Sequence, residues 1–137
     1  MAKYRHDLPQ RHGGIFLTDG GMETTLIFHE GIELPHFAAF VLLDSPEGRQ
    51  KLKQYYASYL AVARDYGAGF VLDSPTWRAN PDWGAKLDYD TAALKAINVR
   101  SIASSRSCGP VGKGRAARLA SSAAPSARVV TATRRVT

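Results

Sequence analysis

The sequence predicts an α/β protein in which parallel strands alternate with helices. Two short apolar runs, 15–18 and 69–72, have the length of buried strands, and an aspartate follows each of them. A long amphipathic helix pattern separates the two runs, and a second helix pattern begins near Asp90. Strands that are joined by helical crossovers pair in parallel, so we expect a parallel sheet covered by helices.

The first strand leads into an Asp-Gly-Gly turn and a short helix, which we expect over 22–29. Gly31 and Pro35 then interrupt the chain before an apolar segment, 37–43.

The second helix, over 46–66, has the clearest pattern in the sequence. Ser45, Pro46 and Glu47 form a helix start, with an N-cap, a proline in the first turn and an acidic side chain. Apolar residues then recur at spacings of three and four, which is typical of a helix with one buried face. They are Leu52, Tyr55, Tyr56, Tyr59, Leu60, Ala63 and Tyr66. We interpret these tyrosines as packing residues.

The second strand is followed by a loop rich in Pro and Trp, from Ser74 to about Trp83. A last helix is expected from an N-cap at Asp90, with its apolar side formed by Leu94, Ile97 and Ile102.

A step in composition divides the chain into two parts, 1–103 and 104–137. The first part has 11 Lys and Arg against 12 Asp and Glu, whereas the second has seven Lys and Arg and no acidic residue. The second part also lacks Phe, Trp and Tyr, so we expect it to be a disordered Ser/Ala/Arg-rich tail.

The remaining composition is that of a soluble globular protein, with 45% apolar and 22% charged residues. We expect no membrane span and no signal peptide, because there is no apolar run of about 18 residues and no apolar segment near the start. A single cysteine cannot form an internal disulfide, which favours a cytoplasmic location.

Ligands of parallel α/β folds bind at the carboxyl ends of the strands. Two segments qualify here, 18–25 and 73–81. The Asp19 carboxylate could receive the ammonium of an amino acid, and the backbone of the following glycines could receive its carboxylate. The alternative is that Asp-Gly-Gly is only a turn.

Three stretches resemble the homocysteine S-methyltransferase family, in the family's order and spacing. They are 17–26 (LTDGGMETTL), 66–70 (YGAGF) and 73–84 (DSPTWRANPDWG), within a resemblance that runs from about residue 16 to 103. The resemblance implies a (β/α)8 TIM barrel that methylates homocysteine on a zinc-bound thiolate to give methionine. It also implies that Asp19, Gly20, Gly21, Thr76 and Trp77 bind the substrate.

The chain lacks features on which methyl transfer in the family depends. The family holds zinc with three cysteines, but Cys108 is the single cysteine here and lies in neither zinc motif. A barrel also takes about 250 residues, whereas this chain supplies about two βα units. We therefore expect a truncated N-terminal barrel fragment that binds no zinc, has no catalytic residue and is inactive alone.

The tail has the properties of a shifted reading frame. If one nucleotide was lost after the Ala103 codon, a permitted restored reading begins Leu-Ile-Glu-Glu-Leu-Arg-Ala-Gly-Trp-Glu. This reading continues the amphipathic helix and later reaches a glycine-rich loop, Gly-Pro-Arg-Gly-Asp-Gly-Tyr, which resembles the loop after the family's third strand.

Two other functions remain open beside the methyltransferase fragment. A basic tail attracts nucleic acid, although this tail lacks stacking aromatics and any helix-turn-helix or zinc pattern. The chain could otherwise be a small α/β interaction protein. An incomplete barrel would leave part of the 46–66 helix uncovered, which predicts non-specific self-association.

Overall fold

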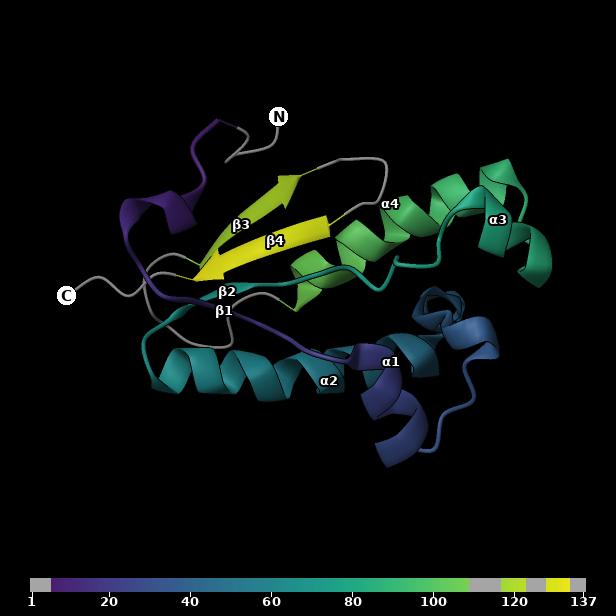
Figure 1. Cartoon of the computed structure of the whole chain (residues 1–137), viewed down its shortest axis with the longest axis horizontal. Helices are drawn as coiled ribbons and strands as arrows, with labels where there is room; N and C mark the ends of the chain where they lie inside the picture. Colours follow the sequence, from purple (N-terminus) through teal and green to yellow (C-terminus); the bar gives the residue numbers. More distant parts are fainter. Residues whose placement is uncertain (1–5, 109–116, 123–127, 134–137) are drawn as a thin grey trace.

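The parallel strand pair expected from the sequence is present. The computed structural model describes residues 6–108, 117–122 and 128–133. Strand β1 (Phe16–Thr18) pairs in parallel with β2 (Gly69–Val71), with Thr18 opposite Val71. In the view of Figure 1, α2 (Pro46–Asp65) runs below this pair and α4 (Thr91–Ser107) lies above it. The α/β class is therefore confirmed, whereas the closed barrel stays a proposal.

Helix α2 begins where its sequence signals predict. The Ser45 hydroxyl accepts a 2.9 Å hydrogen bond from the Gly48 backbone N–H, and Pro46 occupies the first turn. A Cβ atom on Gly48 would collide with the backbone of Leu42, so the glycine allows the helix to approach that segment closely. The helix ends before Gly67, which has the left-handed backbone that glycine adopts readily.

The core lies between α2, the strands and the 3-10 helix η4 (Ala39–Asp44), which packs against both α2 and α4. Its largest fully buried side chains include Leu26, Phe40, Leu43, Leu52, Tyr56, Phe70, Leu72 and Ile97.

This core covers most of the inner face of α2 and corrects one expectation about the helix. Leu52, Tyr55, Tyr56 and Ala63 are buried, whereas Tyr59 and Leu60 are half-buried, so part of this face stays accessible as expected. Tyr66 was expected on that face, but it is 84% exposed, because it lies beyond the last turn of the helix.

Irregular helices fill the segment between β1 and α2. The helix expected over 22–29 is present as α1 (Met22–Thr24) followed by a π-helical turn, η2 (Thr25–His29). A further 3-10 turn, η3 (Pro35–Phe37), precedes η4, and another, η1 (Pro9–His12), precedes β1.

The loop after β2 contains α3 (Pro81–Gly84) and η5 (Ala85–Leu87) and then reaches α4. Asp90 is the N-cap of α4, as predicted, because its carboxylate accepts a 2.7 Å hydrogen bond from the Ala93 N–H. Leu94 and Ile97 are buried as expected, and Ile102 is half-buried. No helix in the described ranges is both long and apolar enough to cross a membrane.

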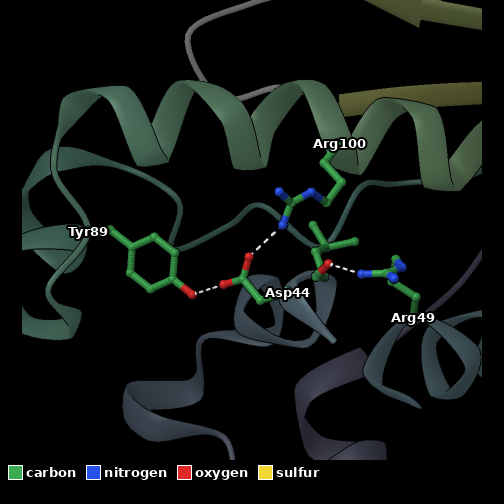
Figure 2. Close-up of polar contacts among 5 residues, drawn as sticks. Asp44, Arg49, Tyr89 and Arg100 are labelled. Atoms are coloured by element: carbon green, nitrogen blue, oxygen red, sulfur yellow. Dashed lines mark hydrogen bonds and ion pairs between the residues drawn. The ribbon is translucent and has the colours of Figure 1, made fainter. Parts of the chain in front are cut away.

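A polar cluster connects η4 to α2, to α4 and to the segment that precedes α4 (Figure 2). The Asp44 carboxylate receives a hydrogen bond from the Tyr89 hydroxyl and forms a 2.5 Å ion pair with Arg100 of α4. Arg49 of α2 donates a 2.7 Å hydrogen bond to the Leu43 carbonyl beside it. These contacts fasten η4 to both long helices.

Parts of the segment 104–137, which we expected to be a disordered tail, are described as helix and strand. Helix α4 continues past the predicted boundary to Ser107, and β3 (Ala117–Ser122) pairs antiparallel with β4 (Arg128–Thr133). The β4 sequence, RVVTAT, is rich in β-branched residues, which favour strands. β4 lies next to β2 (Figure 1). The remainder of the predicted tail, at 109–116, 123–127 and 134–137, lies outside the described residues.

Candidate functional site

The candidate site lies at the carboxyl ends of β1 and β2. Because Thr18 is opposite Val71, the chain leaves both strands at the same edge of the sheet. Asp19 follows β1 directly, and Asp73 lies two residues after β2. The parallel pairing thus brings together 18–25 and 73–81, the two segments that the sequence predicts to bind a ligand.

Burial and charge set the protonation of Asp19. Desolvation raises the pKa of this carboxyl above its ordinary value, and a hydrogen bond from Tyr55 lowers it. The negative charges of Asp73 and Glu23 raise the pKa further. A positively charged ligand would relieve this repulsion between carboxylates.

Three tyrosines of α2 form hydrogen bonds with the loops that contain the two aspartates. The Tyr55 hydroxyl is 3.0 Å from Asp19 Oδ2 and 3.1 Å from the Gly20 carbonyl oxygen. The Tyr59 hydroxyl donates to the same carbonyl at 3.0 Å. The Tyr56 hydroxyl donates to the Asp73 carbonyl at 2.6 Å.

The sequence predicts these tyrosines as packing residues, and this prediction accounts for their rings but not for their hydroxyls. The Tyr55 ring lies 5.1 Å from that of Tyr59 and 5.5 Å from that of Tyr56, between centroids. Their hydroxyls are the part that sequence reasoning missed. The available signal was the use of Tyr rather than Phe at buried positions, because a buried phenol usually needs a hydrogen-bond partner.

One oxygen of each aspartate is left without a donor. Asp19 Oδ1 and Asp73 Oδ1 are buried and have no hydrogen-bond partner within the described part of the chain. Leaving a buried acceptor unsatisfied costs about 1–3 kcal/mol, and more for a charged group. An ammonium group, with three N–H donors, has the chemistry to satisfy such oxygens.

The two glycines after Asp19 have different roles. A Cβ atom on Gly20 would meet nothing within 4 Å, so there is open space beside this backbone. Gly21 has a φ of 66°, in the left-handed region that favours glycine, and it precedes the first residue of α1. Gly20 therefore leaves room for a ligand, whereas Gly21 is required by the turn.

The other two predicted site residues lie on the loop after β2 and are placed differently from each other. Thr76 is buried, and its hydroxyl is 2.7 Å from that of Ser74. Trp77 is 61% exposed, and its ring lies 4.0 Å from the guanidinium carbon of Arg78. That guanidinium is also 3.8 Å from the centre of the Trp83 ring. The structure thus places Trp77 in an Arg–Trp stack.

The described residues do not form the three-cysteine zinc site of the homocysteine S-methyltransferase family, which the sequence resembles. Cys108 is half-buried against the core, and its Sγ is 3.5 Å from the Ser104 carbonyl. Burial raises the pKa of this thiol, which disfavours the thiolate that binds metal. The described ranges also hold no group of three or more His, Cys, Asp or Glu with the geometry of a metal site.

No protein-family model, curated protein sequence or solved structure matches this chain.

Proposed function

We propose that this chain carries the amino-acid-binding edge of a homocysteine S-methyltransferase-like (β/α)8 barrel. In this proposal Asp19 accepts the ammonium of homocysteine. The observation that carries it is the buried Asp19 Oδ1, which lacks a donor among the described residues and lies where a parallel strand ends. A fixed acceptor at the carboxyl end of a strand is the usual position of a ligand contact in barrels of this kind.

The other substrate contacts follow from the same edge. Gly20 gives the ligand access to the backbone, because space is open beside it. Gly21 holds the turn that brings that backbone into place. Thr76 and Trp77 are proposed to line the pocket from the loop after β2. The methyl donor is left unassigned among S-methylmethionine, S-adenosylmethionine and betaine.

The chain by itself is proposed to bind without catalysing methyl transfer. The intact family uses zinc to hold the substrate thiolate, and the single, half-buried Cys108 cannot replace three cysteine ligands. We expect metal analysis of the purified chain to show no one-to-one zinc. Zinc bound at micromolar affinity, and lost in Cys108→Ser, would contradict this.

We also propose that residues from 104 onward are read in a shifted frame. The inner face of α4 continues from Ile97 through Ser101 to Ser105, and the Ser105 hydroxyl is buried without a partner in the described ranges. The restored reading has Ile at position 105, and Leu at the position of Cys108, where apolar side chains suit the core. The encoding DNA tests this, because a second frame with Gly-Asn-Cys and Gly-Gly-Cys-Cys motifs downstream is expected.

Ligand binding is tested by calorimetric titration of the full chain with L-homocysteine and with 4-mercaptobutyrate, which lacks the amino group. We expect homocysteine to bind more tightly, and Asp19→Asn to remove the difference. Asp65→Asn, at an exposed position of α2, is the matched control and should leave binding unchanged. Equal binding of the two compounds by the wild-type chain would refute the role of Asp19.

A further inference from the structure

The two oxygens of Asp19 have different environments. Oδ2 is 3.0 Å from the Tyr55 hydroxyl, whereas Oδ1 is buried and has no donor among the described residues. The Tyr55 side chain is itself buried and packs between Tyr56 and Tyr59, so its hydroxyl is held in place.

We infer that Tyr55 is a positioning residue: its hydroxyl holds Oδ2 of Asp19, so that Oδ1 is the oxygen presented to the primary ammonium of a ligand. This inference rests on the proposed function, because it assigns the ligand's ammonium to Asp19. It adds a residue from α2 to a site that the sequence placed only on the loops after the strands.

The neighbouring tyrosines do not have this role. Tyr59 donates to the Gly20 carbonyl, and Tyr56 donates to the Asp73 carbonyl. Within the described ranges, Tyr55 is the tyrosine of α2 that contacts the Asp19 carboxylate. Tyr59 therefore offers a matched control. It lies one helical turn away, and its hydroxyl binds a backbone carbonyl of the same loop instead of the Asp19 carboxylate.

The surroundings of Asp19 give the inference a measurable consequence. The charged groups that face it are Glu23 from α1 and Asp73 from the loop after β2, and both raise the pKa of Asp19. The hydrogen bond from Tyr55 acts in the opposite direction and lowers this pKa. Tyr55 remains protonated at neutral pH, because burial and the charge of Asp19 raise its own pKa. It therefore helps to keep Asp19 ionised.

The test is a carbon-13 NMR titration of the Asp19 carboxyl in the full chain, in wild type, Tyr55→Phe and Tyr59→Phe. We expect Tyr55→Phe to move the midpoint to higher pH, and Tyr59→Phe to move it less. A fluorinated tyrosine incorporated at position 55 keeps the ring and donates more strongly, so it should move the midpoint to lower pH. This third variant decides the question even if the phenylalanine variant fails to fold.

Homocysteine binding across pH provides the second readout. Near the Asp19 midpoint we expect Tyr55→Phe to weaken binding by about tenfold, which corresponds to about 1.4 kcal/mol. In Tyr55→Phe, the pH at which the affinity for homocysteine rises should increase together with the midpoint of the Asp19 carboxyl titration.

Each result is decisive for one of the two proposals. If the wild-type chain binds no homocysteine, the proposed function fails, and the carboxyl titration still tests Tyr55. An unchanged midpoint in Tyr55→Phe, or an equal shift in Tyr59→Phe, overturns the role of Tyr55.

Discussion

Tyr56 and Asp73 are joined by a 2.6 Å hydrogen bond from the phenol hydroxyl to the backbone carbonyl. The bond ties the middle of α2 to the segment that leaves β2, 17 positions later in the chain. Tyr56 is 2% exposed, and burial raises the pKa of its hydroxyl, which therefore stays a donor. The contact holds Asp73 in place while leaving its carboxylate uninvolved.

Replacement of Tyr56 by Phe should lower the free energy of unfolding by about 1 kcal/mol, because it removes a part-buried hydrogen bond to the Asp73 carbonyl. Urea unfolding of the full chain measures the change. Tyr66→Phe removes a hydroxyl from a side chain that is 84% exposed, and its effect should stay within about 0.5 kcal/mol. Equal effects of the two substitutions would show that the Tyr56 bond does not stabilise the loop.

Asp19→Asn should stabilise the folded chain at neutral pH. Since burial raises the pKa of Asp19 above its ordinary value of 3.8, the folded state binds this proton more tightly than the unfolded state does. Stability from this group is therefore lost as pH rises from about 3.8 through the raised folded pKa. Urea unfolding at a series of pH values should show that Asp19→Asn raises the free energy of unfolding at neutral pH. This increase should disappear below the pH range in which Asp19 ionises. A gain that is independent of pH would contradict the assignment.

The ion pair between Asp44 and Arg100 should contribute little despite its short distance (Figure 2). Its side chains are 46% and 44% exposed, and exposed pairs contribute about 0.2–1 kcal/mol. A double-mutant cycle with Asp44→Asn and Arg100→Gln should give a coupling energy in that range, decreasing at high salt. The exposed pair of Arg64 and Asp65 serves as a comparison and should couple no more strongly. A coupling above about 2 kcal/mol would show that the pair behaves as a buried one.

Ser105→Ala should raise the free energy of unfolding by about 1 kcal/mol or more, because it removes a buried hydroxyl that lacks a partner in the described ranges. Ser107→Ala, at an exposed position of the same helix, controls for the higher helix propensity of alanine. Thermal unfolding compares the two variants. If Ser105→Ala destabilises the chain, its hydroxyl has a partner, and the argument that position 105 suits an apolar residue fails.

Local signals in the sequence were sufficient for the starts of the two long helices and for the order of elements from β1 to α4. Ser45 and Asp90 cap their helices as predicted, because an N-cap interacts with backbone groups only two or three residues away. The parallel pairing of β1 and β2 followed from two apolar runs separated by a helix. The meeting of Asp19 and Asp73 at one edge followed from that pairing.

The hydrogen bonds of the site were decided by the tertiary structure. Helical spacing placed Tyr55 and Tyr66 on the same face, yet one is buried beside Asp19 and the other is 84% exposed. Spacing gives the direction of a side chain around the helix axis, but it does not say which turns a neighbouring element covers.

The sequence by itself determined the α/β class, the start of the long helix and the choice of Asp19 as a candidate ligand residue. Only the tertiary structure decided that Tyr55 contacts one oxygen of Asp19, and that Asp44 meets Arg100 across 56 positions. The physical reason is the range of the interactions. Caps and periodicity act within a few residues, whereas these contacts depend on how η4, α2 and α4 pack around one core.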